Sequence, residues 1–534
     1  MMLLGKEVAV FIRTKHVSGH DYVQLVESRW EDGRSRQRVV ATLGRLDQLQ
    51  EKGQVEGWMR SLSRLSDKVS VQAAHAEGNL RALTVRHIGP EQVFGRLWAD
   101  CGLDVILHDL VKRRRFTFDV ERAVFATVLH RLFESGSDRQ GLRFLRDVAV
   151  SGTDDLELHH LYRAMRFLGE NRDAVEERLF EKTKDLFTSL DLVFFDTTSL
   201  YFEGQGGEEL GAYGHSKDHR PDRHQVVVGA LLSESGRPLH CEIAPGNQTD
   251  VATLLPVVDR ARERFGLSQV CFVADRGMVS APVIAGLEER GLGYILGMRM
   301  RRVTEVREEV LSRAGRYETV AENLEVKEVW VNDRRYLVCH NPDEAEKDAA
   351  DRAVILDALA QALHGGAGGL IANRGYRRYL TVAKGAVQID PRKVKADVRF
   401  DGKWVLRTNT SLAAAEVATQ YKRLLIVEQF FRAAKSLLET RPIYHHYDAT
   451  IAGHLFVSFL ALVLRHELEQ RLAKRGWKFE WQDIVRDLTA MDEVEVRHHR
   501  RRYLLRTPLP GVAGKVLQAV GVAIPPPVRE TGRS

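Results

Sequence analysis

The stretch LVFFDTTSLYF at residues 192–202 marks the point where the chain changes from a helical to a strand-like pattern. Its first four residues are apolar, and a short continuous apolar run is typical of a strand that is buried on both faces. Further elements follow in the order strand 224–234 (HQVVVGALLSE), strand 238–247 (PLHCEIAPGN), helix Asp250 to Phe265, strand 269–275 (QVCFVAD), helix Ser280 to Arg290 and strand 293–299 (GYILGMR).

This order predicts the fold class. Three antiparallel strands, then a helix, a strand, a helix and a strand, are the order of an RNase H-like α/β catalytic core. The core still lacks its last helix, which arrives only in the stretch 421–442, and a structureless loop of roughly a hundred residues is improbable in a compact domain. The intervening runs 327–341 and 387–409 carry strand patterns of their own. We therefore predict a β-rich insertion that folds as a separate unit.

Three acidic residues occupy positions from which this core can aim them into one site. Asp196 and Asp275 stand at the polar ends of buried strands, and Glu428 lies within the helical run YKRLLIVEQFFRAAKSLLETRP at 421–442. Two Mg²⁺ ions about 4 Å apart require carboxylate oxygens, one ion to activate an attacking oxygen and one to stabilise a leaving oxygen. The three carboxylates therefore predict two-metal phosphoryl transfer on nucleic acid.

Each of these acids also has an ordinary interpretation. An aspartate at a strand end is commonly a turn or capping residue, and Glu428 stands four residues before Arg432, the spacing of a surface ion pair. Two observations favour the site: Asp196 and Asp275 end strands of the same predicted sheet, and large apolar residues surround Glu428. A carboxylate near a packed boundary needs a partner or a metal.

The chain resembles the DDE-type transposases of bacterial insertion sequences, in the branch with a helical Tyr, Arg, Glu, Lys signature. Tyr421, Glu428 and Lys435 follow one another at intervals of seven residues, which predicts one stripe along a continuous helix. The signature's Arg position holds Leu424 here. The resemblance runs from the strand of Asp196 to about His446, with a weaker likeness at the N-terminus.

The resemblance implies Mg²⁺ as cofactor, with Mn²⁺ as a substitute, and DNA contacts from five residues. Tyr421 would stack on a base and Lys435 would meet a phosphate. Three arginines would contact phosphates: Arg276, Arg432 and Arg441. The ordinary interpretations, a packed tyrosine, a lysine extending to solvent and surface arginines, remain open at this point.

We predict six regions along the chain. They are a small N-terminal β element (1–80), a helical region with a DNA-binding role (81–188), the first part of the RNase H-like core (189–302), the β-rich insertion (303–403), the helices that complete the core (404–475) and a basic C-terminal region (476–534). Asp32 and Gly33 predict a hairpin turn in the first region. The interval from Gly136 to Gly141 is compatible with the break of a helix-turn-helix or with a plain helical bundle.

Composition excludes several protein classes. The chain has 534 residues, 44% hydrophobic and 28% charged, with a net charge of +6, which is typical of a soluble multidomain protein. Its four cysteines lack CxxC spacing, so neither a zinc site nor a disulfide framework is expected. The longest apolar run, Leu455 to Leu464, is shorter than a membrane span. We expect a cytoplasmic, nucleoid-associated protein without a membrane partner.

The predicted function is that of an insertion-sequence transposase. It would bind double-stranded DNA at the terminal inverted repeats, cleave it and transfer the freed strand to target DNA, as a homodimer because two ends are cut in concert. One rival is an RNase H-like DNA endonuclease without strand transfer, which would use the same acids. The other is a non-catalytic DNA-binding derivative, which the three intact acids disfavour.

Overall fold

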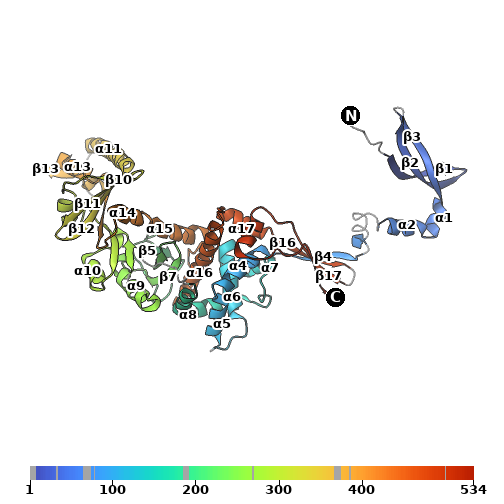
Figure 1. Ribbon diagram of the computed structural model, residues 1–534, viewed down its shortest axis with the longest axis horizontal. Helices are drawn as coiled ribbons and strands as arrows, with labels where there is room; N and C mark the ends of the chain where they lie inside the picture. The colour runs from blue at the N-terminus through green and yellow to red at the C-terminus, as the bar shows by residue number, and fades with distance from the viewer. Residues whose placement is uncertain are drawn as a thin grey trace. The chain divides into compact units, whose positions relative to one another are not determined.

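The computed structural model describes residues 8–31, 34–63, 74–76, 78–112, 114–183, 192–266, 270–365, 374–383, 386–498 and 501–533 (Figure 1). The chain divides into two compact units. One unit combines Met1–Val85, Asp492–Pro508 and Pro525–Ser534, and the other combines Arg86–Met491 and Leu509–Ile524.

The first unit contains two antiparallel sheets. The first sheet consists of β1 (Val8–Val17), β2 (His20–Glu31) and β3 (Arg34–Arg45), and α1 (Leu46–Glu51) and α2 (Gln54–Ser63) follow it in sequence. The second sheet has the order β18-β17-β16-β4, formed by β4 (Leu80–His87), β16 (Asp492–His498), β17 (Arg501–Arg506) and β18 (Val528–Arg533). The predicted turn at Asp32 and Gly33 lies outside the described residues.

The second sheet differs from the predicted division of the chain. The C-terminal region was expected to stand as a region of its own, but β16 to β18 share a sheet with β4 from the N-terminal part. Between these strands the chain returns to the other unit, where α18 (Ala513–Val520) buries Val516 and Leu517 in the main core. Strand pairing between distant segments has no local sequence signal, which explains the difference.

A nine-stranded mixed sheet organises the second unit. Its order is β10-β11-β12-β15-β9-β8-β5-β6-β7. The strands are β5 (Leu192–Tyr201), β6 (Gln225–Ser233), β7 (Pro238–Pro245), β8 (Cys271–Ala274), β9 (Gly293–Met298), β10 (Glu318–Ala321), β11 (Leu324–Val331), β12 (Arg334–His340) and β15 (Lys403–Thr408). Strand β8 runs parallel to both β5 and β9, and the other neighbours are antiparallel.

Strand β5 is buried on both faces of this sheet, as its apolar run predicts. Phe194 packs into one hydrophobic core, while Val193 and Phe195 pack into the core on the opposite face. Helices α9 (Asp250–Phe265) and α10 (Ala281–Glu289) contribute to the core with Phe195. Helix α16 (Asp448–Ala473) and the residues before it contribute to the core with Phe194. Since side chains alternate along a strand, successive residues of β5 enter opposite cores.

The inserted segment does not fold as a separate unit. Strand β15 pairs with β9, with Val405 opposite Met298, and β12, β11 and β10 continue the same sheet. Pairing with β15 satisfies the hydrogen-bonding groups that β9 would otherwise expose at a sheet edge. Beyond the sheet lie η2 (Val306–Val310), α11 (Pro342–Gly365), α12 (Arg374–Arg377), β13 (Leu380–Ala383), β14 (Ala386–Ile389) and α13 (Pro391–Val398). The insertion is thus more helical than expected.

The helical region contains α4 (Gly89–Asp100), α5 (Leu103–Val111), α6 (Val120–Phe133), α7 (Asp138–Asp147) and α8 (Leu158–Thr183), and α17 (Trp481–Thr489) packs against α4. A break between α6 and α7 falls where Gly136 predicts it. Ser137 caps α7 in a capping box with Gln140. Helix α6 is almost entirely buried, so only α7 of this pair presents a face to solvent.

Among the described residues, one helix, α16, is long and apolar enough to cross a membrane, and most of it is buried inside the protein. It is the core helix that the run from Leu455 to Leu464 predicts.

Candidate active site

The structure brings Asp196 and Asp275 to neighbouring strands, but only Asp275 follows the end of its strand. Asp196 was expected at a strand end, and it lies in the middle of β5, which pairs with β6 as far as Tyr201. Phe195 of β5 stands opposite Ala274 of the parallel strand β8, and each is followed directly by one of the two aspartates. Their charges interact, because Asp275 contributes to a raised pKa of Asp196. The carboxyl ends of parallel strands in an α/β sheet are the usual place for a ligand site.

Burial is the main cause that raises the pKa of Asp196 to about 6. The ammonium of Lys217 and a hydrogen bond from the Thr197 backbone N–H act in the opposite direction, and Asp275 and Asp250 raise the pKa further. Crowded, partly desolvated carboxylates of this kind are typical of sites that bind cations or move protons.

Two residues that the sequence analysis did not single out complete this cluster. Asp250, the first residue of α9, accepts a hydrogen bond from the Thr197 hydroxyl at 2.7 Å. The Lys217 ammonium lies 3.1 Å from Asp250 Oδ2 and 4.0 Å from Asp196 Oδ1, and it donates to the Thr197 carbonyl at 2.7 Å. The sequence carries no local signal for either, because Asp250 is also an ordinary acidic residue in the first turn of a helix.

Tyr421 lies against the second aspartate. Its hydroxyl donates to Asp275 Oδ1 at 2.8 Å, and burial together with Asp275 raises its pKa well above the usual value. Gly297 of β9 makes room for this contact, since a Cβ there would lie 2.3 Å from the tyrosine oxygen. Tyr421 is predicted from the sequence to stack on a base. In the structure its hydroxyl forms a hydrogen bond with Asp275, which is a predicted metal ligand.

The helix that carries Glu428 is interrupted, so the expected single stripe is wrong. Tyr421 belongs to α14 (Ala414–Lys422), Glu428 to α15 (Leu425–Arg432) and Lys435 to the π-helical turn η3 (Ala433–Leu437). At the first break the Leu424 N–H bonds to the carbonyl of Tyr421, three residues back, and the Arg423 guanidinium pairs with Glu234. A turn with a bond three residues back rotates the chain more per residue than an α-helix does. Residues seven apart across this turn therefore do not lie on the same helix face.

Glu428 is exposed on α15, a helix that packs against β5 and β6. Val427 and Phe431 bury the opposite side of the helix. Within the described part of the chain Glu428 makes no hydrogen bond or ion pair, so the ordinary surface pair with Arg432 is not formed.

Lys435 and Arg441 converge on one buried carboxylate. Asp218 Oδ1 lies 2.7 Å from Lys435 Nζ and 2.9 Å from Arg441 Nη1, and the Asp218 side chain is only 4% exposed. Burial lowers the pKa of Lys435, and Asp218 opposes this shift. Lys435 is therefore a partly buried, paired lysine, not a free surface cation. Asp218 directly follows Lys217 in the chain. Lys217 contacts the carboxylates of Asp196 and Asp250, and Asp218 contacts the two cations.

The two remaining predicted arginines, Arg276 and Arg432, are exposed. Arg276 directly follows Asp275 and lies near Tyr421, whose pKa its charge lowers. An open cleft of about 380 Å³ beside Asp275 is lined by Arg276, Arg299, Arg301 and Arg302. Arg299 fixes the turn after Asp275 by donating to the carbonyls of Arg276 and Gly277.

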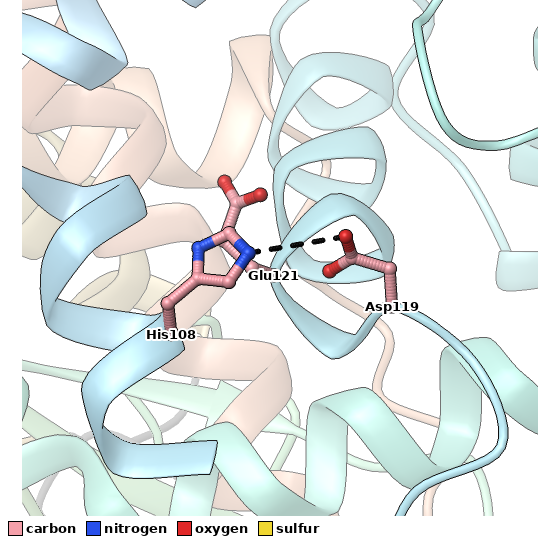
Figure 2. A group of neighbouring side chains, drawn as sticks. All are labelled: His108, Asp119 and Glu121. Carbon is pink, nitrogen blue, oxygen red and sulfur yellow. Dashed lines mark ion pairs between the residues drawn. The ribbon is translucent and has the colours of Figure 1, made fainter. Parts of the chain in front are cut away.

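A second group of side chains has the composition of a metal site. His108, Asp119 and Glu121 lie together on α5, at the N-cap of α6 and in its first turn (Figure 2). Glu121, however, already accepts hydrogen bonds from Trp98 at 2.6 Å and from Arg122 at 2.5 Å, and Asp119 caps α6. The group is therefore explained by an ion pair and a helix cap without a metal.

Family models match two parts of the chain. Residues 11–75 match the model of the IS1634 family transposase N-terminal domain, and residues 188–464, more than half of the chain, match the model of the transposase DDE domain. A cryo-EM structure of the piggyBac transposase synaptic complex with hairpin DNA is similar at 11% identity and a TM-score of 0.37, over 75% of this chain and 76% of that chain. No curated protein matches the sequence.

Domains of the DDE type cleave DNA and transfer the strand with the help of divalent metal ions. The chain belongs to the DDE transposases of insertion sequences.

Proposed function

We propose that this transposase binds the terminal inverted repeats of its element, uses Asp196, Asp275 and Glu428 to hold two Mg²⁺ ions, and transfers each freed strand end to target DNA. The observation that carries the proposal is the register of β5 and β8: Phe195 is opposite Ala274, so Asp196 within β5 and Asp275 after the end of β8 directly follow a paired position. The position of α15 over β5 and β6 supports Glu428 as the third acid.

We also propose that the catalytic core has an RNase H-like fold. The strands β5, β6, β7, β8 and β9 follow one another along the chain in the succession predicted for such a core. In the sheet they are neighbours in the order β7-β6-β5-β8-β9, with β8 parallel to β5 and β9, which supports the proposal. Helices α9 and α10 connect the strands in the expected succession. The insertion then extends the sheet beyond β9.

The residues fit divalent cations. Neighbouring carboxylates raise the pKa of Asp196, and a bound cation relieves this repulsion. The Lys217 ammonium contacts both Asp196 and Asp250, which supports a cluster that attracts positive charge. When bound, the ions supply Lewis acidity for phosphodiester displacement. The residues of the chain orient the carboxylates. Thr197 and Lys217 contact Asp250, and the Tyr421 hydroxyl donates a hydrogen bond to Asp275.

Positive charge next to the acids supports a DNA path across the site. Arg276 and Arg302 line the cleft beside Asp275, and Lys435 and Arg441 share a single carboxylate, which leaves net positive charge there. Arg432 adds an exposed cation at the end of α15. Because the two ends of an element are cut in concert, the active form on DNA is proposed to be a homodimer.

The test is a set of isosteric variants, Asp196→Asn, Asp275→Asn and Glu428→Gln, assayed with end DNA, Mg²⁺ and a supercoiled target. Each is expected to lose cleavage by about a thousandfold, which is about 4 kcal/mol of transition-state stabilisation, because one ligand of a metal pair is gone. End binding should change little, since phosphate contacts lie on other residues.

Glu263→Gln on the exposed face of α9 is the matched control and should cleave like the parent chain. A Glu428→Gln enzyme that nicks end DNA at the parent rate contradicts the assignment of the third acid. Separation of nicked from joined products distinguishes a transposase with strand transfer from an endonuclease that only hydrolyses.

A further inference from the structure

A cleft of about 660 Å³ lies between α7 and the segment that follows η3, outside the acidic cluster. Its lining includes Arg139 and Arg143 of α7, Tyr162 of α8, and Arg441 and Tyr444. Arg441 also contacts Asp218, so the cleft begins next to the site that the proposed function assigns to catalysis.

Two arginines of this cleft are available to an external anion. Arg139 and Arg143 are exposed and stand one helical turn apart on α7, and neither forms an ion pair with any described residue. At the base of the cleft Arg131 is buried, and its Nε has no hydrogen-bond partner in the described part of the protein. Buried donors of this kind are normally satisfied. The charge of Arg131 is met by two acidic residues of the same lining, Asp138 and Glu439, so the exposed Arg139 and Arg143 are the groups left to bind an anion.

Aromatic rings are exposed in the same cleft. Tyr444 is 63% exposed and Tyr162 is 41% exposed, although large rings are usually covered in a folded chain. Cations that follow a backbone, combined with uncovered rings, are the features by which proteins bind unpaired nucleic-acid strands. A fully paired duplex offers no free base faces to such rings along its length.

We propose that this cleft binds a DNA strand with unpaired bases, holding its phosphates on Arg139, Arg143 and Arg441 and stacking a base on Tyr444. The inference rests on the proposed function, since a strand freed at the element's end is the substrate that needs such a place beside the acids. It also assigns a surface to the predicted DNA-binding role of the helical region: the exposed face of α7.

The experiment measures binding of the full chain to a fifteen-nucleotide dT strand and to a duplex carrying the element's terminal repeat, each across a salt series. For the double variant Arg139→Ala/Arg143→Ala, the slope of log affinity for dT against log salt should fall by about 1.4, because two phosphate contacts are lost. If variant and parent bind equally at 1 M salt, the variant should bind about 25-fold more weakly than the parent at 0.1 M salt. Tyr444→Leu should weaken dT binding about fivefold or more and leave the salt slope unchanged, because stacking releases no counterions.

Arg146→Ala is the matched control, an exposed arginine of α7 outside the cleft lining, and should bind dT like the parent chain. Arg143→Glu provides a second variant at an exposed position, and its effect should exceed that of Arg143→Ala. Unchanged dT binding in both the double variant and Tyr444→Leu overturns the proposal. If these variants bind like the parent while Asp196→Asn abolishes cleavage, the cleft assignment alone is wrong; if Asp196→Asn still cleaves, the proposed function fails first.

Discussion

At the scale of single residues, the hydroxyl of Tyr421 determines how Asp275 is presented. The hydrogen bond between them involves a charged acceptor in a partly buried place, where such bonds contribute about 1.5–3 kcal/mol. The absence of a side chain at Gly297 leaves the space in which the Tyr421 hydroxyl reaches Asp275.

Tyr421→Phe is therefore expected to slow cleavage about 10- to 100-fold and to weaken Mn²⁺ binding, because Asp275 loses the donor that fixes one oxygen. End-DNA binding should stay within about twofold of the parent chain. The measurements are a Mn²⁺ titration without DNA and a cleavage time course. Tyr447→Phe, at a highly exposed tyrosine, is the control. Full Mn²⁺ affinity in Tyr421→Phe would show that the ring, not the hydroxyl, is the important part.

Lys435 is expected to contact DNA while it remains paired with Asp218. Lys435→Gln should lower the salt slope of end binding by about one, as the loss of one phosphate contact requires. Asp218→Asn should also weaken end binding, and this effect should vanish in the Lys435→Gln, Arg441→Gln background if Asp218 acts only through these two cations. An Asp218 effect that persists in that background would reveal an independent role.

At the scale of elements, the insertion is tied to the catalytic sheet through β15 and β12. Leu337 of β12 is fully buried in the same core as Phe194 of β5, whereas Leu359 of α11 belongs to a small separate cluster with Tyr379 and Leu380. A strand that completes a sheet shares its cooperative unit, and a peripheral cluster opens at lower free energy.

Leu337→Ala is consequently expected to lower the free energy of unfolding of the catalytic sheet by about 2–5 kcal/mol, because it leaves a cavity in the shared core. Leu359→Ala should leave the sheet's stability nearly unchanged. Hydrogen exchange of β5 amides separates the two cases. Equal protection of β5 in the parent chain and in Leu337→Ala would mean that the insertion folds independently of the sheet.

At the scale of the whole molecule, buried histidines set the response to acid. Burial lowers the pKa values of His130, His445 and His466 from 6.5 to about 4, so these rings are neutral in the folded chain at pH 6. The unfolded chain binds protons on them between pH 6.5 and 4, and stability is lost as pH falls through this window. Asp138 and Asp196 have pKa values raised to about 6 in the folded chain, so their protonation increases stability as pH falls. These two carboxyls oppose the effect of the three histidines.

Thermal unfolding of the full chain should therefore show a Tm that falls from pH 6.5 to pH 4.5. His466→Gln removes one titrating ring and should reduce the pH dependence of the unfolding free energy by up to about 1.4 kcal/mol per pH unit. A Tm that rises over this range would mean that the two aspartates dominate.

The sequence by itself determined the features that depend on local periodicity. The buried run of β5, the alternation of strands and helices up to β9, and the position of Asp275 after the end of β8 follow from short apolar patterns, which neighbouring residues set. The same patterns placed Asp196 at a strand end, whereas β5 continues past it because pairing with β6 extends the strand. The break between α6 and α7 was likewise predicted from the interval between Gly136 and Gly141. The family followed from the acids and the signature.

Only the tertiary structure decided which distant residues meet. The contacts of Lys217 with Asp250, of Asp218 with Lys435 and of Tyr421 with Asp275 join segments between 33 and 217 residues apart, and no local pattern records such pairings. The interrupted signature helix and the fusion of the insertion with the sheet have the same origin. The conformation of the turn at Leu424 and the strand that pairs with the edge of β9 both depend on distant residues that pack there. They are therefore set by the folded chain and not by any one segment.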